Sequence, residues 1–412
     1  MKKASIISVG NEVLSGLTID TNAAHLSGEL LSLGIPVVSG YTVADEIEAI
    51  TGAIGHAWTE ADVILITGGL GPTEDDLTRS AIAKFLDVQL EFRAELLDRI
   101  KAFFDKRGRQ MSDTNRVQAF LPIGVEPLDN PIGTAAGLLA EKQGKLLAAL
   151  PGVPSEMKQM FRDSLAPRLH PWVGSQIVKS RKLRCFGTGE SNIAEMLGSL
   201  MQRGRNPLIN CTVHGSIITL HIIAQADGER PAIHMLDRDE KQLRQLLGDL
   251  VFGCDEQMLA EVVGAQLASQ GKTVATAESC TGGLLAAMLT EVPGASQYFI
   301  QGWVTYTNQS KMRQLGVPRR CIDAHGAVSE QVARAMAAGA RRTAGTDFGI
   351  GITGIAGPAG GTEQKPVGLV YIGVDSASGV SCEKHVFSHG RSAVRLRSAL
   401  TALNLLRRNL KA

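Results

Sequence analysis

The sequence predicts an α/β protein of three domains, the first of which is built on a doubly wound parallel sheet. Within residues 4–67, short apolar strands alternate with amphipathic helices, which is typical of parallel strands joined by crossover helices. Residues 177–253 instead combine two strands with charged helices, as in a small α+β module. Residues 256–412 return to short strands that end in glycine-rich loops, so we expect a second α/β domain there. We place the first domain at residues 1–170, since 412 residues fit two or three domains of ~150 residues each.

Local signals justify each element of the first domain. The unbroken apolar run at residues 62–67 is typical of a strand that is covered on both faces. Asp20 and Thr21 are good helix-capping residues, and Gly34 can end the helix that they begin. The predicted elements are a strand at 4–9, a loop at 10–16, a helix at 20–34, a strand opening at 37–38, a helix at 47–58, a strand at 62–67, a charged helix near 91–107 and a helix capped by Ser155.

The same signals place the elements of the other two domains. Leu259, Val263 and Leu267 recur at helical spacing, and Gly271 ends that helix. In the middle module we expect strands at 177–186 and 217–224 with helices at 191–200 and 235–250, and no evident chemistry. In the last domain we expect strands at 272–276, 304–306, 349–353 and 369–374 with helices at 284–289 and from Asn308.

Composition excludes several classes of function. The net charge is +1, with 42 basic and 41 acidic residues, so there is no electrostatic basis for binding nucleic acid or a membrane surface. Aromatic residues make up only 4%, which argues against base-stacking surfaces. No stretch approaches the ~20 apolar residues of a membrane span. The six cysteines show no C-x-x-C spacing, so we expect reduced thiols in a cytoplasmic protein.

A glycine-rich loop follows the strand at 62–67. In sheets of this kind ligands bind beyond the carboxyl ends of the strands. Gly68, Gly69 and Gly71 allow backbone amides to face an anion, and the helix after Thr73 adds its positive end. The loop therefore predicts a phosphate site.

Acidic residues next to this loop suggest a metal ion. Asp75 and Asp76 are adjacent, and Glu12 follows the first strand of the same sheet. Carboxylates so placed can hold a hard divalent cation against a phosphate. The alternative is that Thr73 and Asp75 only cap the next helix.

The last domain is organised around residues 277–283, which connect the strand at 272–276 to a helix. Ser279 lies at this strand-to-helix turn, where free N–H groups favour negative charge. Gly282 and Gly283 let a substrate approach the backbone. A hydroxyl beside such a site suits acyl transfer, whereas the alternative is that Ser279 is a helix cap.

A lysine downstream can activate this serine. On a helix that starts at Asn308, Lys311 lies one turn further on, near the strand end that carries Tyr306. A partly desolvated lysine beside a serine can act as a general base. The alternative is a solvated surface lysine.

Two further features lie near the end of the chain. The strand at 349–353 enters a loop that is rich in glycine, including Gly354 and Gly357, and such a loop suits folding over a ligand. Arg391 and Arg395 stand four residues apart near the start of the last helix. They can jointly grip a phosphate, or they can be solvated helix charges.

Several long motifs together resemble a known family. Residues 275–283, the stretch around Tyr306 and Lys311, residues 325–329 and residues 354–358 resemble the C-terminal domain of the CinA, or competence/damage-inducible, protein family. Stand-alone members of that domain are nicotinamide-nucleotide amidohydrolases. Residues 67–76 and 151–157 resemble the molybdopterin-binding-like CinA domain, which the family links to ADP-ribose pyrophosphatase activity.

The resemblance implies roles for individual residues. Ser279 would attack the carboxamide of nicotinamide mononucleotide, Lys311 would activate it, and Tyr306 would assist in proton transfer or positioning. The products would be nicotinic acid mononucleotide and ammonia, with no cofactor required. Amides near Cys280 and Thr281 would form the oxyanion hole. The expected substrate-binding residues are Cys280, Thr281, Gly282, Gly283, Thr353, Gly354, Gly357, Arg391 and Arg395.

For the first domain, the resemblance implies metal-dependent cleavage of ADP-ribose. The phosphate-binding residues would be Gly68, Gly69, Gly71 and Thr73. The divalent metal ion would be held by Asp75, Asp76 and Glu12.

Two other functions stay open at this point. The chain can be a metal-dependent nucleotide pyrophosphatase with a regulatory C-terminal domain, or a nucleotide-binding regulatory protein without turnover. In each case the expected partners are small nucleotides rather than nucleic acid or membrane, and the many apolar faces lead us to expect a homodimer.

Overall fold

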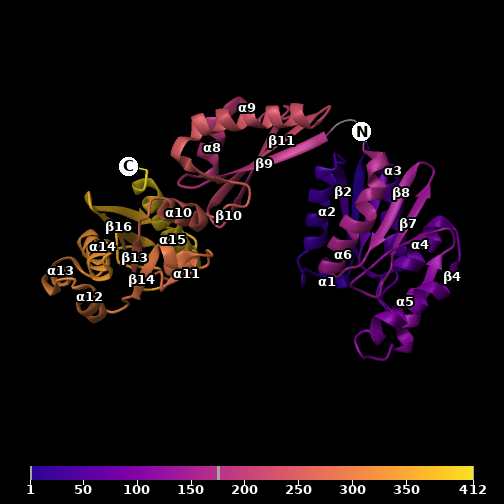
Figure 1. Cartoon of the computed structure of the whole chain (residues 1–412), viewed down its shortest axis with the longest axis horizontal. Helices are drawn as coiled ribbons and strands as arrows, with labels where there is room; N and C mark the ends of the chain where they lie inside the picture. The colour runs from indigo at the N-terminus through magenta and orange to yellow at the C-terminus, as the bar shows by residue number, and fades with distance from the viewer. Residues whose placement is uncertain (1, 174–176, 412) are drawn as a thin grey trace. The chain divides into compact units, whose positions relative to one another are not determined.

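The computed structural model describes residues 2–173 and 177–411 and divides into two compact units. The first unit comprises the chain up to Lys179 together with Ala224–His234. The second comprises Ser180–Ile223 and the chain from Met235 onward (Figure 1). Within the residues that the structure describes, no helix is both long enough and apolar enough to cross a membrane.

The first unit contains a six-stranded sheet in the order β2-β1-β3-β8-β7-β6. The pairs β1–β2, β1–β3 and β3–β8 are parallel, whereas β7 and β6 complete the sheet in antiparallel fashion. Its strands are β1 Ala4–Val9, β2 Val37–Val43, β3 Val63–Thr67, β6 Glu126–Leu128, β7 Gly137–Lys142 and β8 Lys145–Leu150, and a separate pair is formed by β4 Leu90–Phe92 and β5 Phe120–Pro122.

The central strand β3 shows why this sheet needs helices on both faces. All five of its residues are buried. Ile64 and Ile66 pack in the cluster that includes residues of α3 and α4, whereas Val63 and Leu65 pack in the cluster that includes α2 and α6. Alternate side chains of one strand thus enter two cores, and the predicted doubly wound fold is confirmed (Figure 1).

The helices of the first unit follow their predicted start signals with three exceptions. The helix predicted near 91–107 begins at Ala94, because Leu90–Phe92 form β4. The Asp20 carboxylate accepts a hydrogen bond from the Ala23 amide at 2.8 Å and caps α2 as expected. The predicted loop after β1 contains the short helix α1. Ser155 does not cap α6, because Pro154 already occupies the first turn and Val153 precedes it. The helices are α1 Asn11–Leu14, α2 Thr21–Ser32, α3 Ile47–Glu60, α4 Thr78–Leu86, α5 Ala94–Asp105, α6 Pro154–Met160 and α7 Ala166–Leu169, with further short helical segments at Asp113–Ala119, Phe161–Leu165 and His170–Trp172.

The middle module has a four-stranded sheet in the order β10-β11-β9-β12. Strand β10 is not predicted by the sequence, because it lies at the edge of the sheet and most of its side chains are exposed, so it lacks a regular apolar pattern. The elements are β9 Ile177–Cys185, α8 Glu190–Leu197, β10 Leu208–His214, β11 Ile217–Ala226, α9 Glu229–Leu247 and β12 Val251–Cys254, with single turns at Gly198–Met201 and Gly248–Leu250.

The C-terminal part of the second unit contains a five-stranded sheet in the order β14-β13-β15-β16-β17. Strands β14, β13 and β15 are parallel, so their carboxyl ends meet at one edge. The strands are β13 Val274–Glu278, β14 Phe299–Val304, β15 Phe348–Gly354, β16 Leu369–Ser376 and β17 Gly379–Val386. The helices are α10 Leu259–Ser269, α11 Leu284–Thr290, α12 Asn308–Leu315, α13 Arg319–His325, α14 Glu330–Ala344 and α15 Gly390–Asn409, with a single turn at Ala295–Gln297.

This sheet is also covered on both faces. Ala275 and Ala277 of β13 pack in a cluster with residues of α14, whereas Val274 packs in the core that includes α10 and α15. Two strands differ from prediction. Strand β13 covers Val274–Glu278 rather than 272–276, and β14 covers Phe299–Val304 rather than 304–306, so Tyr306 lies beyond it. The predicted start of α12 at Asn308 is confirmed, with Thr307 as its cap.

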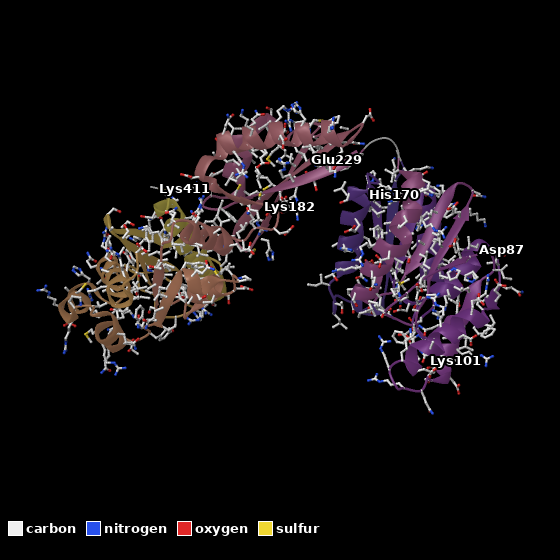
Figure 2. All side chains as sticks on the ribbon, in the orientation of Figure 1. Asp87, Lys101, His170, Lys182, Glu229 and Lys411 are labelled. Atoms are coloured by element: carbon white, nitrogen blue, oxygen red, sulfur yellow. The ribbon has the colours of Figure 1, made fainter. Side chains whose placement is uncertain are left out.

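A buried arginine joins α15 to the middle module. Arg407 is only 1% exposed, and its guanidinium donates to Asn404 Oδ1 at 3.0 and 2.9 Å and to the Asp249 carbonyl. Two ion pairs lie along the same junction, Lys411 with Asp249 at 2.8 Å and Lys182 with Glu256; Figure 2 labels both lysines.

We therefore expect Arg407→Ala to lower the thermal midpoint of the second unit by several degrees. The substitution leaves the buried Asn404 Oδ1 without a donor, at a cost of about 1–3 kcal/mol, and also removes the contact with the part-buried Asp249 carbonyl. Arg408→Ala is the matched control, since the Arg408 side chain is 53% exposed and should contribute little. Calorimetric scans of both variants test this, and equal midpoints for the two would contradict it.

Candidate functional site

Ser279 is the first residue after β13, at the edge where the parallel strands end. Its amide donates to the Ile352 carbonyl of β15 at 3.0 Å, which fixes the residue against the neighbouring strand. The chain then reverses through Gly282 and Gly283, whose φ angles are 62° and 90°. These are left-handed conformations that favour glycine. The turn therefore places the Ser279 hydroxyl, in a side chain that is almost fully buried, at a defined position.

The structure brings the Lys311 amine to this hydroxyl. Lys311 Nζ lies 3.1 Å from Ser279 Oγ and donates to the Thr305 carbonyl at 2.8 Å. The residue is 1% exposed, and it forms no ion pair with a carboxylate in the described part of the chain. Burial lowers the pKa of Lys311 to about 8. A neutral amine at this distance can take the serine proton while one of its own N–H groups still bonds to Thr305.

Glu278 is a residue of this site that the sequence analysis did not identify. It is 1% exposed, and its carboxylate accepts hydrogen bonds from the amides of Gly283, Leu285 and Ala286 at 3.1, 3.1 and 2.9 Å. These are amides at the start of α11. A carboxylate immediately before a predicted helix is a signal that could have revealed this role.

Glu278 changes the expected anion site. The sequence predicts that the open N–H groups at the helix start bind a substrate oxyanion, but Glu278 accepts hydrogen bonds from three of them. Within the described chain, the amides of Cys280 and Thr281 have no acceptor on another residue. The predicted oxyanion donors are thus the ones that stay available.

The side chains of these two residues are both buried. Burial raises the pKa of the Cys280 thiol to about 11, so the thiol stays protonated and does not compete with Ser279 as a nucleophile. Thr281 Oγ1 and Thr305 Oγ1 are buried hydroxyl oxygens without a hydrogen-bond partner in the part of the chain described.

The two arginines of α15 hold two different loops. Arg395 donates through Nε and Nη2 to the Thr281 carbonyl at 3.1 and 2.8 Å, and so braces the Ser279 turn. Arg391 donates through Nη1 to the Gly357 carbonyl at 2.9 Å. Of the two alternatives for this pair, a joint phosphate site or solvated helix charges, Arg395 follows neither, because its guanidinium makes a bidentate contact with the backbone.

Tyr306 and Thr353 lie differently from expectation. Tyr306 is 61% exposed, and Arg391 Nη2 lies 3.4 Å from its hydroxyl, but it forms no hydrogen bond to Ser279 or Lys311 among the described residues. The Thr353 hydroxyl donates to the Ala327 carbonyl at 2.7 Å, so it has no second proton to donate to a substrate.

The predicted glycines of the neighbouring loop are explained by packing. A Cβ on Gly354 would lie 2.7 Å from the Leu369 carbonyl oxygen, and one on Gly357, whose φ is 81°, would lie 2.5 Å from Val367. The loop approaches its neighbours too closely for larger residues.

In the first unit, Asp76 organises the glycine-rich loop after β3. Its carboxylate accepts hydrogen bonds from the amides of Gly71 and Thr73 at 2.7 and 2.8 Å and from the Thr73 hydroxyl at 2.5 Å. Arg79, which is buried, donates to the Leu70 and Gly71 carbonyls from the other side.

The start of the same loop has a glycine conformation. Gly68 and Gly69 have φ angles of 105° and 68°, and the Thr78 hydroxyl donates to the Gly68 carbonyl. The loop is thus braced from within.

The predicted metal ligands do not assemble. The Asp76 carboxylate accepts hydrogen bonds from its own loop. Asp75 is exposed, and the Glu12 carboxylate lies close to Gly10. In residues 2–173 and 177–411, no three His, Cys, Asp or Glu side chains lie close enough to hold a metal ion. The residues as they stand do not fit a divalent cation, because the internal hydrogen bonds of the loop satisfy the carboxylate first.

The described residues of the first unit line cavities that include the following two. One of about 120 Å³ lies at the carboxyl ends of β1 and β3, where the fold predicts a ligand, and Glu12, Asp20 and Asn22 line it. Asn22 donates to Thr67 Oγ1 and to the Gly152 carbonyl, while its Oδ1 is buried without a partner within the described chain. The other, of about 510 Å³, is lined in part by Arg99 and Arg107.

Comparison with known proteins assigns each part of the chain. Residues 5–171 match the family model described as "Probable molybdopterin binding domain", residues 180–253 match "Damage-inducible protein CinA KH domain", and residues 256–410 match "CinA C-terminal domain". A competence-damage inducible protein of Moorella thermoacetica is 43% identical over 411 residues, covering 100% of this chain and 99% of the relative. A CinA-like protein of Kosmotoga olearia is 41% identical over 408 residues, covering 99% of each chain.

A solved structure is similar to part of the chain. The competence/damage inducible protein CihA of Agrobacterium tumefaciens is 42% identical and covers 37% of this chain and 94% of its own, with a TM-score of 0.37. The family assignment rests on the full-length sequence relatives. With their identity above 40% over the whole length, the chain belongs to the CinA family of competence-damage inducible proteins.

Proposed function

We propose that the second unit hydrolyses the carboxamide of nicotinamide mononucleotide to nicotinic acid mononucleotide and ammonia. The observation that carries this proposal is the Lys311 amine, buried without a carboxylate partner among the described residues and 3.1 Å from Ser279 Oγ. A desolvated amine can be neutral and accept a proton, whereas a solvated surface lysine stays protonated. The choice of substrate follows from the resemblance to nicotinamide-nucleotide amidohydrolases.

The proposed reaction has two steps. Neutral Lys311 takes the proton of Ser279, and Oγ attacks the carboxamide carbon. The amides of Cys280 and Thr281 donate to the oxyanion, and the Lys311 ammonium then gives its proton to the leaving nitrogen, so that ammonia departs. A water molecule, deprotonated by Lys311, next attacks the acyl-enzyme ester and releases nicotinic acid mononucleotide and the free serine. Tyr306 and Arg391 would meet the substrate from the rim of the site.

Ser279→Ala should abolish the release of ammonia from nicotinamide mononucleotide. Loss of a serine nucleophile costs on the order of a thousandfold or more in rate. The matched control is Ser269→Ala on α10, whose exposed hydroxyl only donates to the Gln266 carbonyl. Release that survives in Ser279→Ala at the rate of the control would remove the assignment.

The rate should also depend on pH through Lys311. Below its pKa of about 8 the amine is protonated and cannot accept the serine proton, so kcat/KM should rise with pH and level off above that value. Lys311→Arg keeps a cation but stays protonated throughout, and should be inactive across the range. Initial rates from about pH 6 to about pH 10 measure the profile; a rate that falls between pH 7 and pH 9 would exclude a lysine base.

For the first unit we propose cleavage of the pyrophosphate of ADP-ribose. The proposal is supported by the resemblance of the domain and by the cavity at the strand ends, which Glu12, Asp20 and Asn22 line with polar atoms. Because the described residues do not assemble a metal site, we derive no step through a divalent cation, and adding a chelator tests whether the cleavage requires one. A purely regulatory C-terminal domain is the second candidate, and it is distinguished by the Ser279→Ala experiment.

The loop geometry predicts unequal effects of its two aspartates on ADP-ribose cleavage. Asp76→Ala removes three hydrogen bonds that shape the loop and should lower the rate by about tenfold or more. Asp75→Ala removes an exposed carboxylate and should change the rate by less than about threefold. Product analysis by chromatography measures both, with thermal midpoints as a check on folding. Equal and large losses would mean that the two carboxylates act together on a metal ion.

A further inference from the structure

The second unit contains a cavity that lies apart from Ser279. Its volume is about 600 Å³, within the ~300–1,000 Å³ range of small-molecule sites. Four segments line it: the loop after β9, the hairpin of β10 and β11, the end of β17 with the residue that follows it, and α15 between Arg397 and Arg408. The cavity therefore lies where the middle module meets the C-terminal sheet and helix, and no residue of the Ser279 site contributes to it.

The loop after β9 offers backbone donors to this cavity. Gly187, Thr188 and Gly189 lead into α8, which begins at Glu190 without a side-chain cap. Gly187 has a φ of 107°, a conformation that favours glycine. The amides of Gly187, Thr188 and Gly189 have no acceptor in the described part of the chain. Such amides at the start of a helix are donors suited to an anion.

A buried amide on α15 points to a ligand independently of this helix start. Asn404 is 9% exposed, and its Oδ1 accepts two hydrogen bonds from Arg407. Because Arg407 can only donate, the amide orientation is set and Nδ2 is directed away from it. Nδ2 lies 3.8 Å from the position that a Cβ on Gly187 would take, and it has no acceptor within the described residues. An unpaired donor of fixed direction, on a largely buried side chain, thus faces the loop.

Thr401 adds a second buried polar group one turn earlier on α15. It is 8% exposed and lines the cavity, and its hydroxyl has no hydrogen-bond partner among residues 2–173 and 177–411. Buried polar groups in proteins normally have partners. Neither Thr401 Oγ1 nor Asn404 Nδ2 is among the fully buried unpaired atoms of the described chain, so both polar atoms reach the cavity and can bond to a molecule in it.

The charged groups around the cavity suit a phosphate. Arg397 donates through Nε to Ser216 Oγ at 2.8 Å, which orients its guanidinium at the cavity. Arg408 lies 3.5 Å from Glu383, whose other oxygen lies 3.0 Å from His385 Nε2, so this carboxylate is already paired. Glu190 is the other acidic lining residue and can accept from hydroxyl or amino groups of a ligand.

The remaining wall is aromatic and flat. The rings of His385 and Phe387 stack with centroids 5.2 Å apart and an angle of 5° between their planes. Phe186 lines the same cavity. Stacked rings of this kind bind a planar heterocycle through its face.

We propose that this cavity binds a nucleoside phosphate. The phosphate lies against the Gly187–Gly189 amides, Asn404 Nδ2 and Arg397, and the base lies against the His385 and Phe387 rings. This site is distinct from the proposed amidase site and does not depend on it. Its occupant contacts both the middle module and α15, so it ties these two parts of the second unit together.

Titration calorimetry of the full chain with AMP tests the proposal. Asn404→Asp keeps the acceptor for Arg407 but replaces the donor with a negative charge, and should weaken AMP binding by about tenfold or more. Thr401→Val has nearly the same shape and should weaken it by about threefold or more. Arg319→Gln, at an exposed arginine of α13, is the control and should bind like the unchanged protein.

Two further measurements assign the binding to this cavity. Photolabelling with 8-azido-AMP should modify peptides of β17, α15 or the loop after β9, and the label should fall in Asn404→Asp. Amidase activity measured without AMP should be the same in both variants as in the control, because neither residue belongs to the Ser279 site. AMP binding no tighter than that of adenosine, or unchanged in folded Thr401→Val and Asn404→Asp, would overturn the proposal.

Discussion

The burial of one amine is the constraint on which the candidate active site depends. Lys311 lies inside the protein without an opposing carboxylate among the described residues, and a buried unpaired cation is costly. The protein lowers this cost by making the neutral form accessible and by giving the amine two oxygen partners, the Thr305 carbonyl and the Ser279 hydroxyl. The same desolvation that destabilises the cation makes the amine a base. Burial of Lys311 therefore lowers the stability of the folded protein and raises the share of neutral amine available to Ser279 at neutral pH.

The turn that carries Ser279 is held from both flanks by charged groups that do not react. Glu278 satisfies three amides at the start of α11, and Arg395 binds the Thr281 carbonyl through two N–H groups. Between these two contacts, the amides of Cys280 and Thr281 are left for an oxyanion. Rigid support of this kind matters because donors must already point at the position where charge develops.

The loop after β3 in the first unit shows that similar residues can serve another purpose. It combines glycines, a threonine and adjacent aspartates, as a phosphate and metal site would. In the structure Asp76 accepts from Gly71 and Thr73, and Arg79 binds the carbonyls of the same loop, so most of the polar groups satisfy one another. At the ends of β1 and β3, by contrast, Asn22 Oδ1 is buried without a hydrogen-bond partner in the described residues.

The sequence by itself determined the features that depend on neighbours along the chain. The apolar run of β3, the Asp20 cap of α2 and the strand-to-helix turn at Ser279 follow from local patterns, and the structure has them as predicted. Tertiary structure decided which polar groups pair, because partners such as Arg395 and Thr281 lie far apart in sequence and many arginines could have filled that role. It also decided that Glu278 caps α11, that Tyr306 is exposed and that β10 joins a sheet edge, since burial and edge pairing are set by what packs nearby.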